Sequence, residues 1–260
     1  MCQESTKCLC LSIEKLQTLN LQLEGNLTKD QGIQNLSSIL LKKANLSALM
    51  LNLRQNQLTD KCIPYLSSIL NNLKKLQTLN LDLKSNRVCN IANLCISIQN
   101  FPNLFHLTLN LSSNNIQQVG ALSLFKNITF NNLSTLNLIL KCNSIGDIGA
   151  NGLLSSLLRG SKLQNLQVDL SSNSINTNGI TGLVHFLTNN QLVSHLSLNF
   201  EDNQIDESGG KNLVSAISSC FNLSTLKVIL SYNKIDREKS QVFVNKLLKT
   251  KKLVTNQIFL

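Results

Sequence analysis

The chain has 260 residues, enough for one or two ordinary domains, and a formal net charge of +10. No apolar run is long enough to cross a bilayer as a helix, and the first fifteen residues lack the basic-then-apolar layout of a secretory signal. The eight cysteines form no CxxC pair. These features predict a reduced protein in the cytoplasm or another intracellular compartment.

The chain begins with a stretch, LCLSIEK at 9–15, that is typical of the end of a helix, so residues 1–15 are predicted to be a partial N-terminal repeat. Leu16 then opens the frame LxxLxLxLxxN, which appears first as LQTLNLQLEGN at 16–26 and last as LSTLKVILSYN at 223–233. Eight copies follow one another at intervals of 28 to 30 residues. Each ends in a ladder asparagine: Asn26, Asn56, Asn86, Asn114, Asn143, Asn173, Asn203 and Asn233.

The segment LNLILKCNSIGDIGANGLLSSL at 136–157 shows the pattern within one copy. Alternating leucines before the asparagine predict a strand with one buried face, and apolar residues three or four apart after it predict a helix. Repeats of this period indicate a solenoid. We therefore predict a single domain with eight strand-turn-helix repeats over 16–252, followed by a truncated terminal strand at 253–260.

These repeats resemble those of leucine-rich repeat proteins, most closely the ribonuclease-inhibitor-like class, in which every repeat contains a true helix. The resemblance covers Leu16 to the C-terminus. It implies an α/β horseshoe solenoid with a parallel β-sheet on the concave side and α-helices on the convex side. That class usually has the frame LxxLxLxxN, so the additional apolar-polar pair in this chain predicts a strand about two residues longer.

Positions are numbered from the ladder asparagine of each repeat, so that position −3 lies three residues before it. The leucines at −10, −7, −5 and −3 are expected to face inward, and burying each contributes roughly 1.5–3 kcal/mol. The asparagine is expected to be enclosed and to bond backbone groups of neighbouring turns. Position +4 carries predicted helix N-caps: Asp30, Asp60, Asn90, Asp147 and Thr177. Position +6 is small in seven repeats, which predicts close approach of helix to sheet, whereas Lys239 predicts an atypical last helix.

Positions −8, −6, −4 and −2 are expected to point outward onto the concave face. Across eight repeats they carry four bases and four acids, so this face is predicted to be nearly neutral and rich in Asn, Gln, Ser and Thr. The predicted binding residues are most of its charged and apolar members, two asparagines at position −4, and Tyr232 beside them, because exposed apolar groups among polar ones often anchor protein interfaces. They are Met50, Arg54, Asp82, Lys84, Asn110, Ile139, Lys141, Asp169, Asn199, Glu201, Lys227, Ile229 and Tyr232.

The surplus of positive charge lies elsewhere. Lysines and arginines gather where helices return to strands and near the C-terminus; they include Lys42, Lys43, Lys74, Lys75, Arg159, Lys162, Lys251 and Lys252. Two interpretations remain open: solvated helix ends that suit the helix dipole, or a basic rim that docks on an acidic partner, RNA or a membrane. Aromatic residues are too scarce for a base-stacking platform, so binding to nucleic acid is not expected.

No connected catalytic set is evident. His195, Asp169 and Ser197 lie on adjacent predicted strands, but His195 and Asp169 are separated by about 13 Å along the strand direction. His106 and His195 are three repeats apart, about 14 Å, which is too far for one metal ion. The glycines Gly146, Gly149 and Gly152 lack the GK[ST] ending of a phosphate loop. We expect no catalytic residues, metal or cofactor.

The sequence therefore predicts a non-catalytic protein-protein interaction scaffold that is a part of a larger chain or assembly, with one or both solenoid ends covered by another element. Two alternatives remain. The resemblance allows a regulator of an enzyme in trans, of the GTPase-activator or enzyme-inhibitor type, although the inhibitor type has an acidic concave face and the activator type an acidic tail. The basic C-terminal end also allows binding to nucleic acid or an anionic surface, which would weaken steeply with salt.

Overall fold

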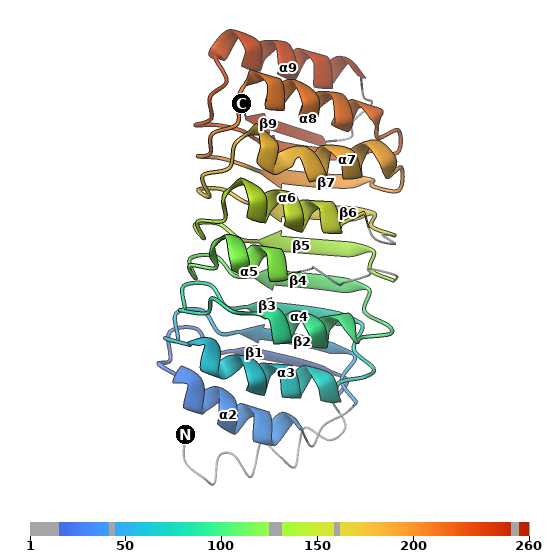
Figure 1. Cartoon of the computed structure of the whole chain (residues 1–260). Helices are drawn as coiled ribbons and strands as arrows, with labels where there is room; N and C mark the ends of the chain where they lie inside the picture. Colours follow the sequence, from blue (N-terminus) through green and yellow to red (C-terminus); the bar gives the residue numbers. More distant parts are fainter. Residues whose placement is uncertain (1–15, 42–44, 125–131, 159–161, 251–254, 260) are drawn as a thin grey trace.

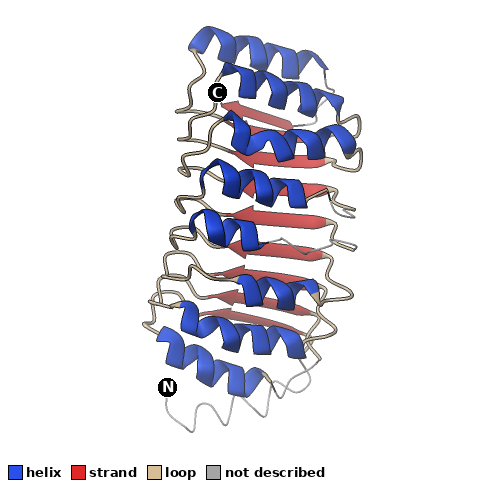
Figure 2. Ribbon diagram, viewed as in Figure 1, coloured by secondary structure: helices blue, strands red, loops and turns tan. Residues whose placement is uncertain are grey.

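The computed structural model describes residues 16–41, 45–124, 132–158, 162–250 and 255–259. Nine parallel strands form one open sheet in chain order, and helices cover one of its faces (Figures 1 and 2). The predicted fold class is confirmed: this is an α/β leucine-rich repeat solenoid with the sheet on the concave side and the helices on the convex side. The partial repeat predicted at 1–15, and Leu253, Val254 and Leu260 of the terminal strand, lie outside the described residues.

Each strand has five residues and occupies positions −8 to −4 of its repeat. The strands are β1 (Thr18–Gln22), β2 (Ala48–Asn52), β3 (Thr78–Asp82), β4 (His106–Asn110), β5 (Thr135–Ile139), β6 (Asn165–Asp169), β7 (His195–Asn199), β8 (Thr225–Ile229) and β9 (Thr255–Phe259). Neighbouring strands pair in register, so equivalent positions align in columns across the sheet. Backbone bonding continues beyond the strands, because Leu140 N–H and Cys142 N–H donate to the Asp169 and Ser171 carbonyls.

A helix follows the strand in each of the eight repeats. The helices are α2 (Lys29–Leu40), α3 (Ile63–Asn72), α4 (Ala92–Gln99), α5 (Gln117–Leu124), α6 (Gly146–Ser156), α7 (Thr181–Asn189), α8 (Glu207–Ser219) and α9 (Arg237–Thr250), with short 3₁₀ segments η2 (Asp60–Cys62) and η3 (Thr177–Ile180) before α3 and α7. Alternate strand residues and one helical stripe share a single apolar core along the solenoid. In β5, for example, Leu136 and Leu138 are buried while Asn137 faces outward.

The asparagines of the inner repeats are hydrogen-bonded to backbone groups on both sides. The Asn173 amide nitrogen donates to the carbonyls of Leu140, Leu170 and Ser171, each at 3.0 Å. Its Oδ1 accepts from the N–H groups of Asn143 and Ile145 in the preceding repeat. This residue is 1% exposed, so five backbone groups near it depend on one side chain in place of water.

The two ends of the asparagine column differ from the predicted enclosure. Asn26 is exposed, and its amide nitrogen donates to the Glu24 carbonyl within its own repeat. Asn233 is half-buried, although it still donates to the carbonyls of Phe200 and Leu230. The difference follows from the direction of the ladder, because each amide nitrogen reaches back to the preceding repeat and no described repeat precedes Asn26.

A feature that the frame does not reveal is a left-handed backbone at position −1 of every repeat. Glycine occupies it only at Gly25, while Ser113, Cys142, Ser172 and Tyr232 adopt φ between 55° and 59°. This conformation costs an L-residue roughly 1–2 kcal/mol. The adjacent asparagine bonds evidently hold the backbone there, since they fix the chain on both sides of this residue.

The predicted N-cap role of position +4 is wrong for most repeats. Asp30 lies within the first turn of α2, and its carboxylate accepts from the Thr59 N–H at 2.8 Å and the Thr59 hydroxyl at 2.6 Å in the next repeat. Asp60 and Asp147 likewise accept from the N–H groups of Cys89 and Asn176, one repeat further on. Position +4 therefore joins repeats.

Capping belongs instead to position +3. Thr59, Asn176 and Asp206 accept from N–H groups of their own helices, and Asp206 receives the Gly209 N–H at 3.0 Å. Only at Asn90 does a predicted +4 side chain accept from its own helix, from the Ala92 N–H. The pKa of Asp206 is lowered to about 2, chiefly by the bond from the Gly209 N–H and then by the bonds from the Ser208 and Thr177 hydroxyls.

The small residues at +6 also have a different role from the one predicted. A Cβ on Gly179 would lie 3.1 Å from the Asp147 Cα, and one on Gly209 would lie 2.5 Å from the Thr177 hydroxyl. On Gly120 it would lie 2.8 Å from the Cys89 carbonyl oxygen. The close approach is therefore to the preceding repeat and not to the sheet.

The connections that lead from each helix to the next strand form the opposite edge of the solenoid, here called the helix-to-strand edge (right in Figure 1). There the repeats are joined by main chain. The carbonyl of Gln164 at position −9 accepts from the N–H groups of Ser194 and His195, and the same pair of bonds recurs at Ser134 and Ser194. The side chain at −9 therefore varies freely among Gln, Ser and Phe.

Candidate binding surface on the concave face

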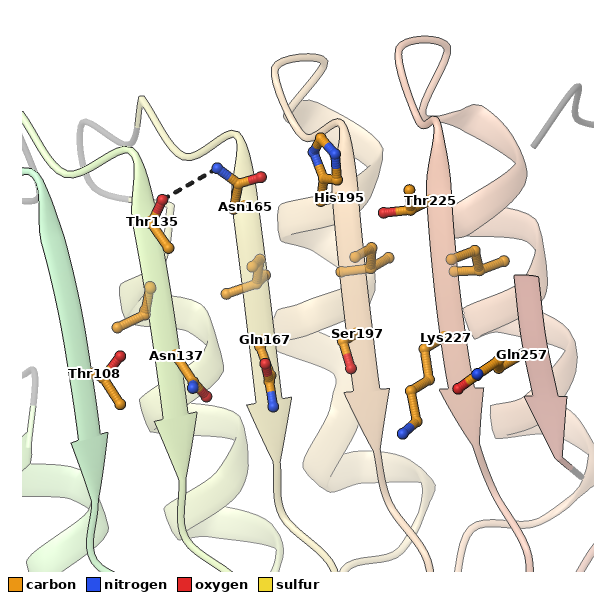
Figure 3. A pocket seen from close by; sticks show the side chains of 14 residues that line it. Thr108, Thr135, Asn137, Asn165, Gln167, His195, Ser197, Thr225, Lys227 and Gln257 are labelled. Carbon is orange, nitrogen blue, oxygen red and sulfur yellow. Dashed lines mark hydrogen bonds between the residues drawn. The ribbon is translucent and has the colours of Figure 1, made fainter. Parts of the chain in front are cut away.

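The concave face is built from the outward positions of the strands. Because the strands pair in register, the −6 column brings together Thr108, Asn137, Gln167, Ser197 and Lys227 from five consecutive strands. Figure 3 shows these side chains projecting from the same face of the sheet. The face is thus a regular array of amides and hydroxyls with few charges.

Several predicted binding residues are held by bonds within the protein. At position −4, Asp82, Asn110, Asp169 and Asn199 use Oδ1 to accept from the N–H at position −2 of the same repeat. Across repeats, Asn110 Nδ2 donates to Asp82 at 2.9 Å and Asn199 Nδ2 donates to Asp169 at 3.1 Å. The main role of these four residues is therefore to bond the backbone N–H groups that follow the end of each strand.

Arg54 is similarly held by acids of the neighbouring repeats. Its guanidinium nitrogens lie 3.8 Å from both the Glu24 and the Asp82 carboxylates. These distances indicate ion pairs rather than hydrogen bonds. The positive charge predicted to serve a partner is balanced within the protein, so the first three repeats present a polar network that is largely closed on itself.

Other predicted binding residues make no such bond or ion pair within the protein. Ile139 and Ile229 occupy position −4, where the other repeats carry Asp, Asn or Gln, and both are half-buried. Among the residues that the structure describes, no carboxylate lies within ion-pair distance of Lys84, Lys141 or Lys227. These three lysines and two isoleucines are therefore the side chains of the face that can respond to a partner.

The remaining predicted residues are dispersed. Met50 is half-buried at −6 of β2, and Glu201 lies at −2 of repeat 7. Tyr232 is 80% exposed and stands at the left-handed position beside Asn233. The structure does not bring Met50 and Tyr232 together, because they lie six repeats apart.

A shallow hollow of about 750 Å³ lies over the strands β4 to β9 (Figure 3). Its polar wall comes from positions −8 and −6: Thr108, Thr135, Asn137, Asn165, Gln167, His195, Ser197, Thr225, Lys227 and Gln257. The sequence analysis missed most of these residues, because it singled out charged and apolar side chains. The signal was nevertheless present in the unbroken polar −8 and −6 columns of these repeats.

Side chains in the hollow make few bonds to one another. Asn165 Nδ2 donates to the Thr135 hydroxyl at 3.1 Å (Figure 3). The His195 Nδ1 lies 2.8 Å from the Ser194 hydroxyl at the rim. Asn137 Oδ1 has no hydrogen-bond partner among the described residues. That oxygen is buried, but Gln167 and Ser197 of the same column are exposed and half-buried, line the hollow and make no hydrogen bond to another described side chain, so they are available to bond a ligand.

The hollow contains no catalytic arrangement of the types considered. His195 pairs with Asn165, whereas Asp169 pairs with Asn199 at the other end of the same two strands. Asp169 accepts from Ser171 and Asn199 and not from His195. No group of three or more His, Cys, Asp or Glu in the described part of the chain is arranged to hold a metal ion.

Two of the buried cysteines have thiols that burial keeps from ionising. Burial raises the pKa of the Cys62 and Cys95 thiols to about 12. Both therefore remain protonated at neutral pH, and the thiolate is the reactive form. They pack as small apolar residues of the core.

Of the predicted basic groups, Lys74, Lys75 and Lys162 lie exposed on the helix-to-strand edge. Lys75 donates to Asn45 Oδ1 at 3.0 Å. Lys42, Lys43, Arg159, Lys251 and Lys252 lie outside the described residues. No helix in the described part of the chain is both long and apolar enough to traverse a bilayer.

No family model matches the sequence, and no curated protein does. Among solved structures, an internalin from Listeria monocytogenes aligns over 97% of this chain and 93% of its own, with 19% identity and a TM-score of 0.27.

Proposed function

We propose that this protein is a non-catalytic scaffold that binds a protein partner on the concave face, over the hollow that spans β4 to β9. The observation that carries the proposal is the contrast between the columns of this face. The residues at position −4 on β3, β4, β6 and β7 are bonded to one another, whereas Gln167, Ser197 and Lys227 in the −6 column line the hollow and make no hydrogen bond to another described side chain.

The chemistry of the hollow suits a protein surface or backbone. Asparagine and glutamine amides each offer donors and an acceptor, as does a peptide group, and the hydroxyls of Thr and Ser adapt to either role. Ile139 and Ile229 border this polar area and can supply the apolar anchors that protein interfaces use. Only Lys227 brings charge into the hollow.

The repeat class, the cellular environment and the enzyme-inhibitor alternative are each supported or weakened by a single feature. The helix in every described repeat supports placing the chain in the ribonuclease-inhibitor-like class. The five described cysteines are free, which supports a reducing, intracellular environment. Inhibition of a basic enzyme is less well supported, because the acids of the concave face are already bonded to Arg54 and to neighbouring amides.

The proposal is tested by blocking the hollow. Ser197→Arg places a long cation in the −6 column at its centre, whereas Asn80→Arg makes the same charge change in the same column on β3, outside the hollow. Both side chains point away from the core, so both variants should unfold at the wild-type temperature. Partners captured by the wild-type protein from native extract are identified by mass spectrometry.

We expect the specific partners to be lost with Ser197→Arg and kept with Asn80→Arg. An identical set of partners for both variants and the wild type would show that binding does not use the hollow. Equal loss with both would place the interface over the whole sheet and not over β4 to β9.

A further inference from the structure

The acidic residues that the structure describes are confined to one side of the solenoid. The sequence has fourteen, and Glu4 and Glu14 lie outside the described residues, which leaves twelve. All twelve lie within positions −4 to +5, that is, around a ladder asparagine. None lies in the described connections of the helix-to-strand edge.

The charged side chains of that edge are cationic. Lys74 and Lys75 occupy positions −12 and −11 of repeat 3, and Lys162 occupies position −11 of repeat 6. All three are exposed, and no acid among the described residues of the edge opposes them. In a chain of net charge +10, this segregation gives the edge a positive potential that the opposite edge lacks.

Large apolar side chains protrude from the same edge. Phe221, at position −12 of repeat 8, is 81% exposed, and Leu192, at −11 of repeat 7, is 51% exposed. Phe105, at −9 of repeat 4, is 48% exposed and packs against His106 with ring centroids 4.9 Å apart. They are single protrusions on the edge that also carries Lys74, Lys75 and Lys162.

The backbone beneath Phe221 is held in place. Its N–H donates to Gln191 Oε1 at 3.2 Å, and the next residue, Asn222, donates from Nδ2 to the Gln191 carbonyl at 2.6 Å. The turn is therefore fixed to the preceding repeat, while the Phe221 residue is largely exposed. Structure alone does not require an aromatic residue here, since the equivalent positions hold Lys74 and Pro102.

We propose that the helix-to-strand edge docks on an anionic lipid surface, with Lys74, Lys75 and Lys162 near the headgroups and Phe221 and Leu192 inserted between them. Basic residues close to an anionic leaflet are attracted to it, and exposed apolar side chains add binding when they enter the boundary of the acyl region. The solenoid would stand on this edge and leave its concave face open to a protein partner.

Lipid fits this edge better than nucleic acid does. Single-stranded nucleic acid requires aromatic faces at successive base positions, but Phe105 and Phe221 lie four repeats apart. A leucine offers no stacking surface, whereas it inserts readily among lipid chains. The lysines are also spread along the edge: Lys162 lines a hollow of about 690 Å³ beside Phe105, whereas Lys74 and Lys75 lie outside it.

The experiment uses the full chain and sedimentation with vesicles of phosphatidylcholine, with or without phosphatidylserine, at low and high salt. The edge variant carries Lys74→Glu, Lys75→Glu and Lys162→Glu. The matched control carries Lys61→Glu, Lys211→Glu and Lys234→Glu, which makes the same change in net charge at exposed sites away from this edge. A third variant is Phe221→Ser.

We expect binding only to vesicles with phosphatidylserine. Each lysine near the surface contributes about fivefold, so the edge variant should lose more than about a hundredfold in affinity while the control loses about tenfold or less. Phe221→Ser should lose about tenfold and keep the wild-type dependence on salt.

Three results would overturn the proposal. Equal losses in the edge variant and the control would mean that net charge alone attracts the protein. Equal binding to vesicles without phosphatidylserine would remove the role of the lysines. Retention on single-stranded RNA without binding to vesicles would assign the edge to nucleic acid.

Discussion

The two edges of this solenoid are held together in different ways. The edge where strands lead into helices, here called the strand-to-helix edge, has its repeats joined by side chains. Asn173 bonds five backbone groups there, and the carboxylates of Asp30, Asp60 and Asp147 each accept from the next repeat. At the helix-to-strand edge, the carbonyl at position −9 accepts two N–H groups from the next repeat. No particular side chain is needed for that pair of bonds.

This difference determines how much of the sequence is free. The strand-to-helix edge has to keep its asparagines, its small residues at +6 and most of its acids. The helix-to-strand edge keeps its buried leucines and a few asparagines that donate to carbonyls of the preceding repeat, while its other exposed positions hold lysine, proline or phenylalanine. Protruding residues such as Phe221 therefore require an explanation other than stability, which is what lipid docking supplies.

The strongest test of the comparison is Asn173→Ala against Gln164→Ala. Removing the Asn173 amide leaves five buried backbone groups without it, and each unsatisfied group costs about 1–3 kcal/mol before water or relaxation compensates. We expect the free energy of unfolding to fall by about 3–5 kcal/mol. Urea denaturation followed by circular dichroism measures it.

Gln164 is the matched residue on the other edge. Its carbonyl joins two repeats as the Asn173 amide does, but its side chain is exposed and Ala keeps the carbonyl. The expected loss is below about 0.5 kcal/mol. If Gln164→Ala costs as much as Asn173→Ala, the side-chain and main-chain edges are not distinct.

The repeat frame predicts the fold well because each of its positions has one physical role throughout. Leu136 and Leu138 must be buried and Asn137 must not be, and the same alternation holds in seven copies. In the first copy, by contrast, Leu21 is half-buried and Leu16 is exposed. The bonds made by position +4 were not predictable in this way. Asp30 is a good N-cap in isolation, and only the stacked neighbour, with Thr59 nearby, shows that its carboxylate spans two repeats.

The binding surface was less predictable, because composition does not reveal which polar groups are already bonded. Asp82 and Asp169 were chosen for their charge, yet both close their own strand ends. Ser197 and Gln167 were passed over as neutral, although they line the hollow. Whether a polar side chain is available to a partner depends on the bonds it makes to the neighbouring strand, and the repeat pattern of one strand does not show those bonds.

A second test uses the close fit of the strand-to-helix edge. In a helix, Gly→Ala normally stabilises by about 1 kcal/mol. At Gly120 the new Cβ would lie 2.8 Å from the Cys89 carbonyl oxygen and 2.5 Å from Ile116 Cγ2, so we expect a loss of about 2 kcal/mol instead. The denaturation midpoint of Gly120→Ala checks the sign.

Gly152→Ala is the control for helix propensity. The added Cβ there meets only the Leu122 side chain, at 2.4 Å from its Cδ2, which can rotate away. This variant should be neutral or slightly more stable than wild type. A stabilised Gly120→Ala would show that the repeats are not packed against each other as closely as the structure has them.

The smallest effect expected is a gain. Ser172 occupies the left-handed position −1 with φ of 55°, and glycine adopts this conformation without steric cost. Ser172→Gly should therefore raise the free energy of unfolding by about 0.5–1 kcal/mol, after the larger entropy of the unfolded glycine chain is subtracted.

Ser194→Gly makes the same change on the other edge, where the backbone is not left-handed. That variant also loses the hydroxyl bond to the Gln164 carbonyl at 3.3 Å, so it should be less stable than wild type by about 0.5–1 kcal/mol. Opposite signs for one substitution at two edges would show that backbone strain is concentrated where side chains hold the repeats together. Equal signs would mean that the asparagine bonds do not impose the left-handed backbone beside them.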